Sequence, residues 1–295
     1  MAFKVLAFTG NWGKWCAMRR FIVLSFSLLT AVCADSACAQ DGSSQEASTL
    51  RELCTERPGL TTAACTVDPG HLQVEIGLAT WERDRTAQEK DETLDLGEIQ
   101  ARYGLGRSTE VQMSWTAYTR DSVTDFSSGV SQHASGIGDV TLGLKQNLLH
   151  PQEKAPGLAA GILPYVVLPS ATHGVGDGDW SAGLTVPLSY KFGDLVTVAL
   201  SPQIQAAVDE DRHGRHLAFG AAAGLQFSVT DTLRLSPEIE IMQDQDPQEA
   251  STLAQAAVSL AWRLDTVSQV DFQTTAGLND NTPDVQIAFG ISRKF

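Results

Sequence analysis

Several residues of the sequence have the chemistry of a hydrolase, although their pattern does not favour one. His133 lies near Ser135, and His173 lies near Ser170, so each pair combines a potential general base with a potential nucleophile. A hydrolase also needs a group that orients the histidine, and neither pair matches the motif of a lipase or acyltransferase. We therefore expect no catalytic residues, and a lipid-acting enzyme is the least favoured function.

A second group of residues could bind a divalent cation. The stretch DEDRHGRH, residues 209–216, places His213 and His216 among carboxylates, and both residue types are common metal ligands. A charged surface loop explains the same residues without a site, and we favour that interpretation. The stretches GVGDGDW and GLGRST lack, respectively, the closing glutamate of a calcium loop and the following helix of a phosphate site. We expect no metal site and no cofactor.

The start of the sequence has the pattern of a secretory signal peptide. The basic pair Arg19 and Arg20 precedes an apolar core from Phe21 to Val32, and alanines precede a cleavage position at Gln40. The core is too short for a transmembrane helix, which needs about 20 residues. We predict that residues 1–39 are a signal peptide that is removed.

Removal of this leader would leave an acidic chain with two cysteines. Four basic residues and one acidic residue would be lost from totals of 21 and 35, which changes the net charge from −14 to −17. An acidic surface repels phosphate backbones, so nucleic acid is not an expected partner. Cys54 and Cys65 lie eleven positions apart in an exported chain. We predict a disulfide between them, with two free thiols as the alternative.

From His71 onward, apolar and polar residues alternate as they do in strands with one apolar face. Each alternating segment is ten to fourteen residues long, whereas globular strands average about five or six residues and membrane-spanning strands need about nine to eleven. The twelve segments are centred on residues 71–81, 93–104, 109–119, 137–149, 158–168, 180–192, 195–207, 216–229, 232–243, 252–264, 266–277 and 284–295.

Connections and aromatic residues complete the pattern of a barrel. Short connections alternate with longer polar ones that begin at Glu82, Asp121, Ser170, Asp209 and Gln243, as in up-and-down barrels. Aromatic residues of the apolar stripe lie near segment ends, as in the girdles of a transmembrane barrel: Tyr103, Trp115, Trp180, Phe192, Phe227, Trp262 and Phe295. We predict an all-β fold, a transmembrane antiparallel up-and-down β-barrel of about 12 strands over residues 70–295. An N-terminal periplasmic or plug-like segment over residues 40–69 would precede it.

Charged residues occupy the positions opposite the apolar stripe, where a barrel has its lumen. The lumen-lining candidates are Glu75, Glu98, Arg102, Glu110, Asp139, Lys145, Glu238 and Glu240. In the packed core of a soluble β-sandwich or barrel, which is the competing fold, buried charges would be costly. Arg102 and Glu110 flank the turn at residues 104–109, so we expect them to pair. The charges could set a constriction and its selectivity, or they could only stabilise a filled interior.

The last residues of the sequence form an apolar strand that we expect to pair with the first strand and close the barrel. Ile287, Phe289 and Ile291 would face lipid, and Phe295 would lie at the periplasmic interface. Phe289, Ile291 and Phe295 also resemble the signal that the outer-membrane assembly machinery reads. Arg293 breaks the apolar stripe, and near the end of a strand its side chain can reach the headgroups.

Four stretches resemble a known family: TERPGLTTAACTVDPGHLQVEIG (55–77), SGIGDVTLGLKQNLL (135–149), LPYVVLPSATHG (163–174) and WSAGLTVPLSYKFGD (180–194). They are similar to an outer-membrane transporter family catalogued under the MetA pathway of phenol degradation. The resemblance covers most of Thr55 to Phe295, and it departs at LPSA, where such proteins typically have Pro-Thr-Gly. It implies a β-barrel of the bacterial outer membrane that passes small hydrophobic or aromatic solutes.

The expected function is therefore a passive outer-membrane channel. Its expected partners are the solute, outer-membrane lipid and lipopolysaccharide, and the barrel assembly machinery. The alternative from another class is a structural or adhesive barrel that acts through its acidic surface loops.

Overall fold

A computed structural model describes residues 50–150 and 156–295. The predicted signal peptide, residues 1–39, and residues 40–49 of the predicted plug-like segment lie outside the described residues. The described part of the chain belongs to one compact unit. No helix among the described residues is long and apolar enough to cross a membrane.

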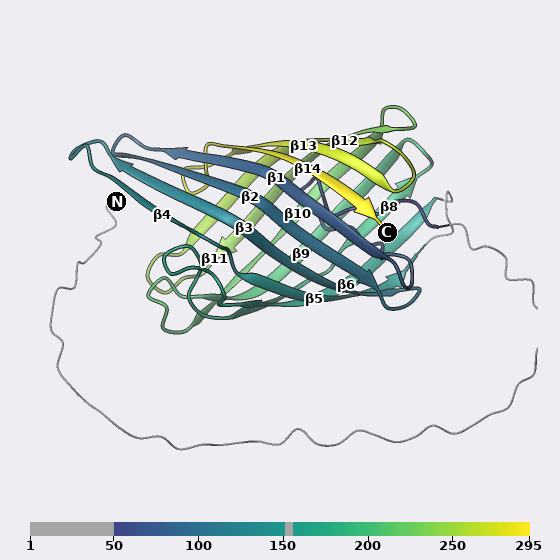
Figure 1. Cartoon of the computed structure of the whole chain (residues 1–295), viewed down its shortest axis with the longest axis horizontal. Coiled ribbons are helices and arrows are strands. Elements are labelled where there is room, and N and C mark those ends of the chain that lie inside the picture. The colour runs from purple at the N-terminus through teal and green to yellow at the C-terminus, as the bar shows by residue number, and fades with distance from the viewer. Residues whose placement is uncertain (1–49, 151–155) are drawn as a thin grey trace, which may run out of the picture. The chain divides into compact units, whose positions relative to one another are not determined.

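The described chain is built from strands joined by turns and loops (Figure 1). The strands are β1 (Leu72–Arg85), β2 (Glu89–Gly104), β3 (Thr109–Asp125), β4 (Ser131–Gly136), β5 (Val140–Leu149), β6 (Gly157–Leu168), β7 (Ser181–Thr185), β8 (Leu188–Phe192), β9 (Val196–Val208), β10 (Arg215–Ser228), β11 (Leu233–Asp244), β12 (Ser251–Arg263), β13 (Ser268–Gly277) and β14 (Val285–Lys294).

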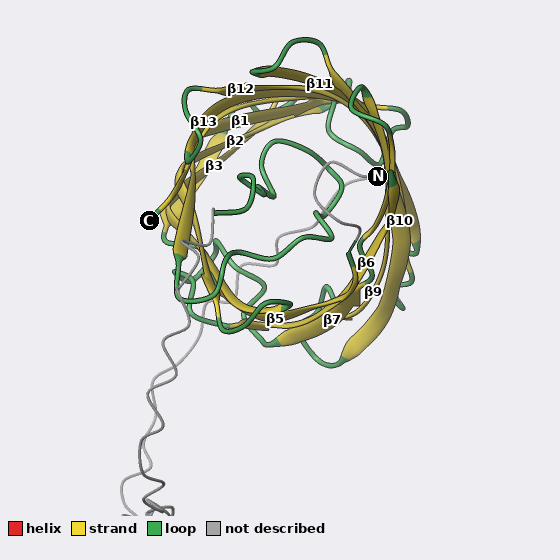
Figure 2. Cartoon of the chain, turned by 90° about the vertical axis from the view of Figure 1, so that its right-hand side faces the viewer, coloured by secondary structure: helices red, strands yellow, loops and turns green. Residues whose placement is uncertain are grey.

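These segments form a closed antiparallel barrel of twelve strands. β4 and β5 both pair with β3 and act as one strand, and β7 and β8 both pair with β6 and β9 around Pro187. β14 pairs with β1, which closes the ring of strands seen from one end in Figure 2. The predicted fold class and strand number are confirmed.

The two faces of the wall differ in polarity as the alternation predicts. The large hydrophobic side chains that remain exposed lie along the outward face, including Leu144, Ile241 and Phe289. Most of the buried polar and charged side chains face inward. An apolar outer belt around a polar interior is the inverse of a soluble barrel and is suited to lipid.

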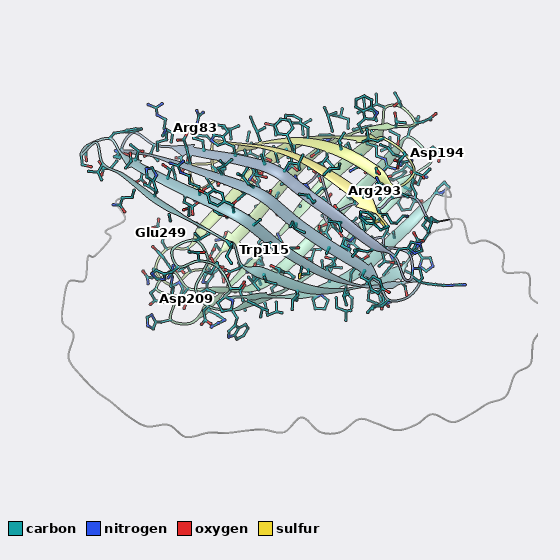
Figure 3. The ribbon with its side chains drawn as sticks, in the orientation of Figure 1. Arg83, Trp115, Asp194, Asp209, Glu249 and Arg293 are labelled. Carbon is teal, nitrogen blue, oxygen red and sulfur yellow. A yellow bond between two sulfur atoms is a disulfide. The ribbon has the colours of Figure 1, made fainter. Side chains whose placement is uncertain are left out.

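The barrel has two distinct ends, which Figure 3 separates. Asp194 and Arg293 lie at the end that carries the short turns and Phe295, which we call the turn end. Arg83, Asp209 and Glu249 lie at the opposite end, which we call the loop end. Backbone hydrogen bonds in both directions join Leu72 to Phe295, so the seam is paired up to the last residue.

Two segments predicted as loops are strands instead. The chain after Glu82 continues as a β1–β2 ladder as far as the Arg85–Lys90 pair. The chain after Asp121 pairs with β4 as far as the Thr124–Ser131 pair. Outside the membrane neither face must be apolar, so the alternation that marked the other strands stops although backbone pairing continues.

A β-bulge changes which residues of β1 face inward. The register with β14 shifts between Gly77 and Ala79, and Gly97 of the neighbouring strand has a positive φ of 69°. As a result, Glu75 and Thr80 are both buried inside although one position is odd and the other even.

Candidate functional site in the barrel lumen

Residues 50–69, which we call the luminal segment, lie against the inner faces of strands on several sides of the barrel. Their backbone is bound by side chains from β1, β2, β3, β5, β9, β11 and β13. Figure 2 shows loop chain inside the ring of strands. The segment has no strand of its own, so these side chains supply the hydrogen bonds that a buried backbone requires.

Arg102 on β2 anchors both ends of the disulfide loop. Its fully buried guanidinium donates Nε and Nη2 to Oε1 of Glu110, at 3.0 and 2.8 Å, and Nη1 to Oε1 of Glu75 at 3.1 Å. The same group donates to the backbone carbonyls of Cys54 at 2.7 Å and Cys65 at 3.2 Å. The several donors of arginine allow one side chain to join two wall carboxylates to the luminal segment.

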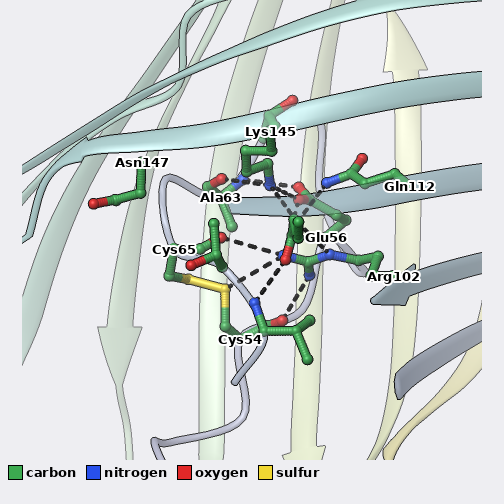
Figure 4. A network of polar contacts seen from close by, with 12 residues as sticks. Cys54, Glu56, Ala63, Cys65, Arg102, Gln112, Lys145 and Asn147 are labelled. Atoms are coloured by element: carbon green, nitrogen blue, oxygen red, sulfur yellow. Dashed lines mark hydrogen bonds and ion pairs between the residues drawn. A yellow bond between two sulfur atoms is a disulfide. The ribbon is translucent and has the colours of Figure 1, made fainter. Parts of the chain in front are cut away.

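Lys145 on β5 binds the luminal segment from the neighbouring wall (Figure 4). Its buried ammonium group contacts Glu56 and donates to the carbonyl of Ala63 at 2.9 Å. Oε1 of Glu56 also lies 3.5 Å from Nη2 of Arg102, and its Oε2 accepts the N–H of Ala63 at 2.9 Å. We call Glu56, Glu75, Arg102, Glu110 and Lys145 the luminal cluster. It contains three carboxylates and two cations, so the cations offset two of the three negative charges in a buried site.

Glu56 remains a carboxylate in this cluster. Burial raises the pKa of its side chain, but the charges of Lys145 and Arg102 outweigh that effect and hold the pKa below the usual 4.5. The ionised form is therefore the one that binds both cations at neutral pH.

The opposite wall binds the tip of the disulfide loop. Glu238 on β11 accepts the backbone N–H groups of Leu60 and Thr61, both at 3.0 Å. Gln273 on β13 accepts the N–H of Gly59 at 2.8 Å. A Cβ at Gly59 would lie 2.9 Å from Oε2 of Glu238, and its φ is +143°, so a side chain here would displace the loop.

The predicted disulfide joins Cys54 to Cys65, with a Cα–Cα distance of 6.2 Å. It closes the loop that carries Glu56 and Gly59. The cross-link lowers the conformational entropy of the loop when the loop is released from the wall, and this favours the bound loop.

The remaining sequence candidates lie apart from the luminal cluster. Oε2 of Glu98 contacts Thr80 and lies 3.8 Å from Nη1 of Arg57, and Glu240 accepts hydrogen bonds from amide side chains. Asp139 accepts the N–H groups of Ser170 and Ala171 and so shapes a connection at the loop end.

Sequence reasoning missed the partners supplied by the luminal segment itself. Glu56 was not a candidate, and neither was Asp68, which binds Lys294 at 2.8 Å and Arg51 at 2.9 Å. Residues 50–69 have no strand periodicity that would have marked them.

A cavity of about 190 Å³ lies in the lumen on the loop side of the cluster. Uncharged groups line it: Gln100, Gln112, Ser114, Thr141, Gly143, Leu163, Tyr165, Thr185 and Gln203. The Tyr165 hydroxyl donates to Gln205 at 3.2 Å. Amides, hydroxyls and one aromatic ring suit a small neutral solute better than an ion.

The wall beside this cavity has an interrupted ladder. β5 and β6 pair at Gly143–Tyr165 and again at Gln146–Ile162, with no pairing between, because Pro164 has no N–H. A shallow depression on the lipid side is lined by Leu142, Leu144, Pro164 and Val166, together with Gly143 and Tyr165. Gly143 and Tyr165 thus line both the lumen cavity and the lipid-side depression.

The candidate catalytic pairs do not form a site. His133 lies exposed on β4, and His173 lies exposed in the connection after β6. Among the described residues, neither histidine hydrogen-bonds to its neighbouring serine.

The closed barrel, its apolar belt and its polar lumen define an outer-membrane β-barrel. The chain belongs to the family described as Putative MetA-pathway of phenol degradation, whose model matches residues 55–295. The resemblance seen in the sequence is thereby confirmed.

A solved structure supports the fold. The chain is similar to the COG4313 outer membrane channel from Pseudomonas putida F1, with 16% identity, a TM-score of 0.65, and coverage of 81% of this chain and 99% of that one. It also resembles the NanC porin (10% identity, TM-score 0.48, 76% and 100% covered) and the CymD monoaromatic hydrocarbon channel (13%, 0.42, 77% and 88%). At these identities the likeness concerns the fold alone. A comparison with curated proteins found no match.

Proposed function

We propose that this protein is a passive outer-membrane channel for small hydrophobic or aromatic solutes, and that the luminal segment controls passage through it. The observation that carries the proposal is the arrangement of the lumen. An uncharged cavity beside Tyr165 lies next to a segment that is bound by charged side chains and closed by a disulfide. A solute is then selected by size and neutrality rather than by chemistry.

Two routes leave the cavity. The axial route toward the turn end passes the luminal segment, which must shift for a solute to pass. The second route leads through the wall beside the Gly143–Tyr165 pair, where the ladder is interrupted, to the apolar depression on the lipid side. This route suits a hydrophobic solute because it joins uncharged lining residues to an apolar surface.

Family membership supports an aromatic solute, because the family is described by the degradation of phenol. Phenol combines an apolar ring with one hydroxyl group. The cavity offers both an aromatic ring and amide acceptors for such a molecule.

Conductance in planar bilayers tests the proposal. Arg102→Ala should loosen the luminal segment and increase the open probability relative to the wild type, and phenol should reduce the current by occupying the cavity. Glu238→Gln removes the anchor on the other wall and should act in the same direction. If the wild type and both variants carry no current, an axial channel is excluded.

A structural or adhesive role is the second candidate, favoured by the β1–β2 and β3–β4 hairpins that extend beyond the other strands in Figure 1. Deletion of residues 121–135 removes one of these hairpins. It would abolish surface binding and leave solute flux unchanged if adhesion were the function.

The remaining partners belong to the same proposal. Phe289, Ile291 and Phe295 lie on the outward face of β14 and its end, where the assembly machinery could read them. The acidic loops face lipopolysaccharide and its bridging cations.

A further inference from the structure

Four side chains from two neighbouring connections meet at the loop end. Asp209 follows β9, His216 lies on β10, Asp244 ends β11, and Asp246 follows it. Nδ1 of His216 lies 3.0 Å from Oδ1 of Asp209 and 3.4 Å from Oδ2 of Asp246. The sequence placed only Asp209 and His216 near each other, and pairing of β10 with β11 adds the other two.

The imidazole is buried and aimed into this cluster. The side chain of His216 is only 5% exposed, and those of Asp209 and Asp246 are 13% and 10% exposed. Nδ1 lies at hydrogen-bond distance from Asp209, and Nε2 lies 2.6 Å from Oδ1 of Asp244, so both ring nitrogens face carboxylates. A neutral imidazole has one ring proton and can donate to only one of them. A cation at Nδ1 would leave the Nε2 proton for Asp244.

The distances match those of ligand atoms around a small divalent cation. Metal–ligand bonds of about 2.1 Å place neighbouring ligand atoms about 3.0 to 3.4 Å apart, for octahedral and tetrahedral geometry respectively. The two separations from Nδ1 are 3.0 and 3.4 Å, and the three ligand atoms lie within 4.8 Å of one another.

The carboxylates are held in place before any cation binds. Oδ2 of Asp246 accepts the N–H of Glu210 at 2.8 Å, and its Oδ1 accepts that of Gln248 at 2.7 Å. A Cβ at Gly214 would lie 2.5 Å from Oδ2 of Asp209, so glycine leaves room for this carboxylate.

The negative charge of the three aspartates around His216 also favours a bound cation. Three carboxylates surround one imidazole, and no lysine or arginine among the described residues forms a salt bridge with any of them. A metal-binding histidine commonly presents its second ring nitrogen to a carboxylate, and Asp244 is positioned for that role.

We propose that Asp209, His216 and Asp246 bind a divalent transition-metal ion of the Zn²⁺ type, with Asp244 orienting the imidazole. The imidazole nitrogen favours such an ion over Ca²⁺ or Mg²⁺, which prefer oxygen ligands. The ion joins the connection after β9 to the connection after β11 and so fixes the mouth of the lumen. The sequence alone favoured a charged loop without a site, and the proposal departs from that expectation.

Zn²⁺ binding to the purified full-length mature barrel, without a polyhistidine tag and after chelator treatment, tests the site by calorimetry. One Zn²⁺ should bind, and His216→Gln and Asp246→Asn, which remove direct ligands, should weaken binding by at least the roughly 10- to 100-fold that is typical of losing an outer-shell partner. His213→Gln is the matched control, because His213 lies in the same connection with its side chain 87% exposed, and it should bind Zn²⁺ as the wild type does.

Hydrogen exchange provides the second readout. Zn²⁺ should slow amide exchange in residues 209–216 and 244–248 of the wild type but not of Asp246→Asn. This loop variant keeps the test possible if His216→Gln does not assemble into a barrel. Equal Zn²⁺ affinity in the wild type and Asp246→Asn, no binding by the wild type, or Ca²⁺ binding that is insensitive to His216→Gln would overturn the proposal.

Discussion

Substitution of Glu56 by glutamine should release the luminal segment from the wall. Glutamine has nearly the same shape and can still accept the N–H of Ala63, so the change removes the charge rather than the packing. Lys145 and Arg102 then lose the charged oxygen, Oε1 of Glu56, that contacts both of them.

The size of the effect follows from the burial of these cations. Removing one partner of a buried ion pair costs about 3–5 kcal/mol. Lys145 keeps Glu110 at 3.6 Å, so the lower end of that range applies. About 3 kcal/mol corresponds to a roughly 100-fold shift toward the released segment, since each 1.4 kcal/mol is a factor of ten.

Hydrogen exchange of the segment measures this shift. Backbone amides of residues 56–67 should exchange about 100-fold faster in Glu56→Gln than in the wild type. Glu52→Gln is the matched control, because Glu52 lies in the same segment with a 57% exposed side chain and pairs with Arg234 and Arg263. Exposed pairs contribute at most about 1 kcal/mol. Equal exchange in the two variants would refute the role assigned to the luminal cluster.

Four further outcomes are expected. Because the pKa of Glu56 is depressed in the folded state, its contribution is present above the usual value of 4.5 and is lost as pH falls through the folded pKa; the protection factors of the segment, which correct for the intrinsic slowing of amide exchange in acid, should decrease on acidification, and protection factors that do not change with pH contradict this. Replacing Cys54 and Cys65 together by alanine should destabilise the bound loop by about 3 kcal/mol, seen as faster exchange without loss of the barrel. Gly143→Leu should narrow the lumen cavity and slow solute uptake with the barrel intact, because a Cβ there already meets Cδ1 of Leu163 at 3.0 Å; unchanged uptake removes this cavity from the route. Phe295→Asp should lower the amount of heat-modifiable barrel in the outer membrane, and unchanged amounts would remove Phe295 as an assembly signal.

The wall could be predicted because lipid imposes a strict pattern on it. Each strand must turn apolar residues outward, so alternation located all twelve wall strands to within a few residues over most of their length. The Arg102–Glu110 pair followed from the turn between their strands. The bulge in β1 and the positive φ of Gly97 could not be foreseen, since they change the inward face without interrupting the apolar pattern.

The luminal segment could not be placed from the sequence in the same way. Its backbone is satisfied by side chains up to 243 positions away, and such partners leave no local periodicity. Glu56 therefore looked like an ordinary polar residue. The candidate cluster of Asp209, His216 and Asp246 could not be assembled from the sequence for a related reason, because Asp246 comes from the neighbouring connection after β11.

Uptake of a labelled monoaromatic solute by intact cells tests the central claim most directly. Cells of a porin-poor strain that assemble the protein should take up phenol at limiting concentration faster than cells with an empty vector, and uptake of a charged sugar phosphate should not change. Equal phenol uptake with and without assembled protein would contradict the account.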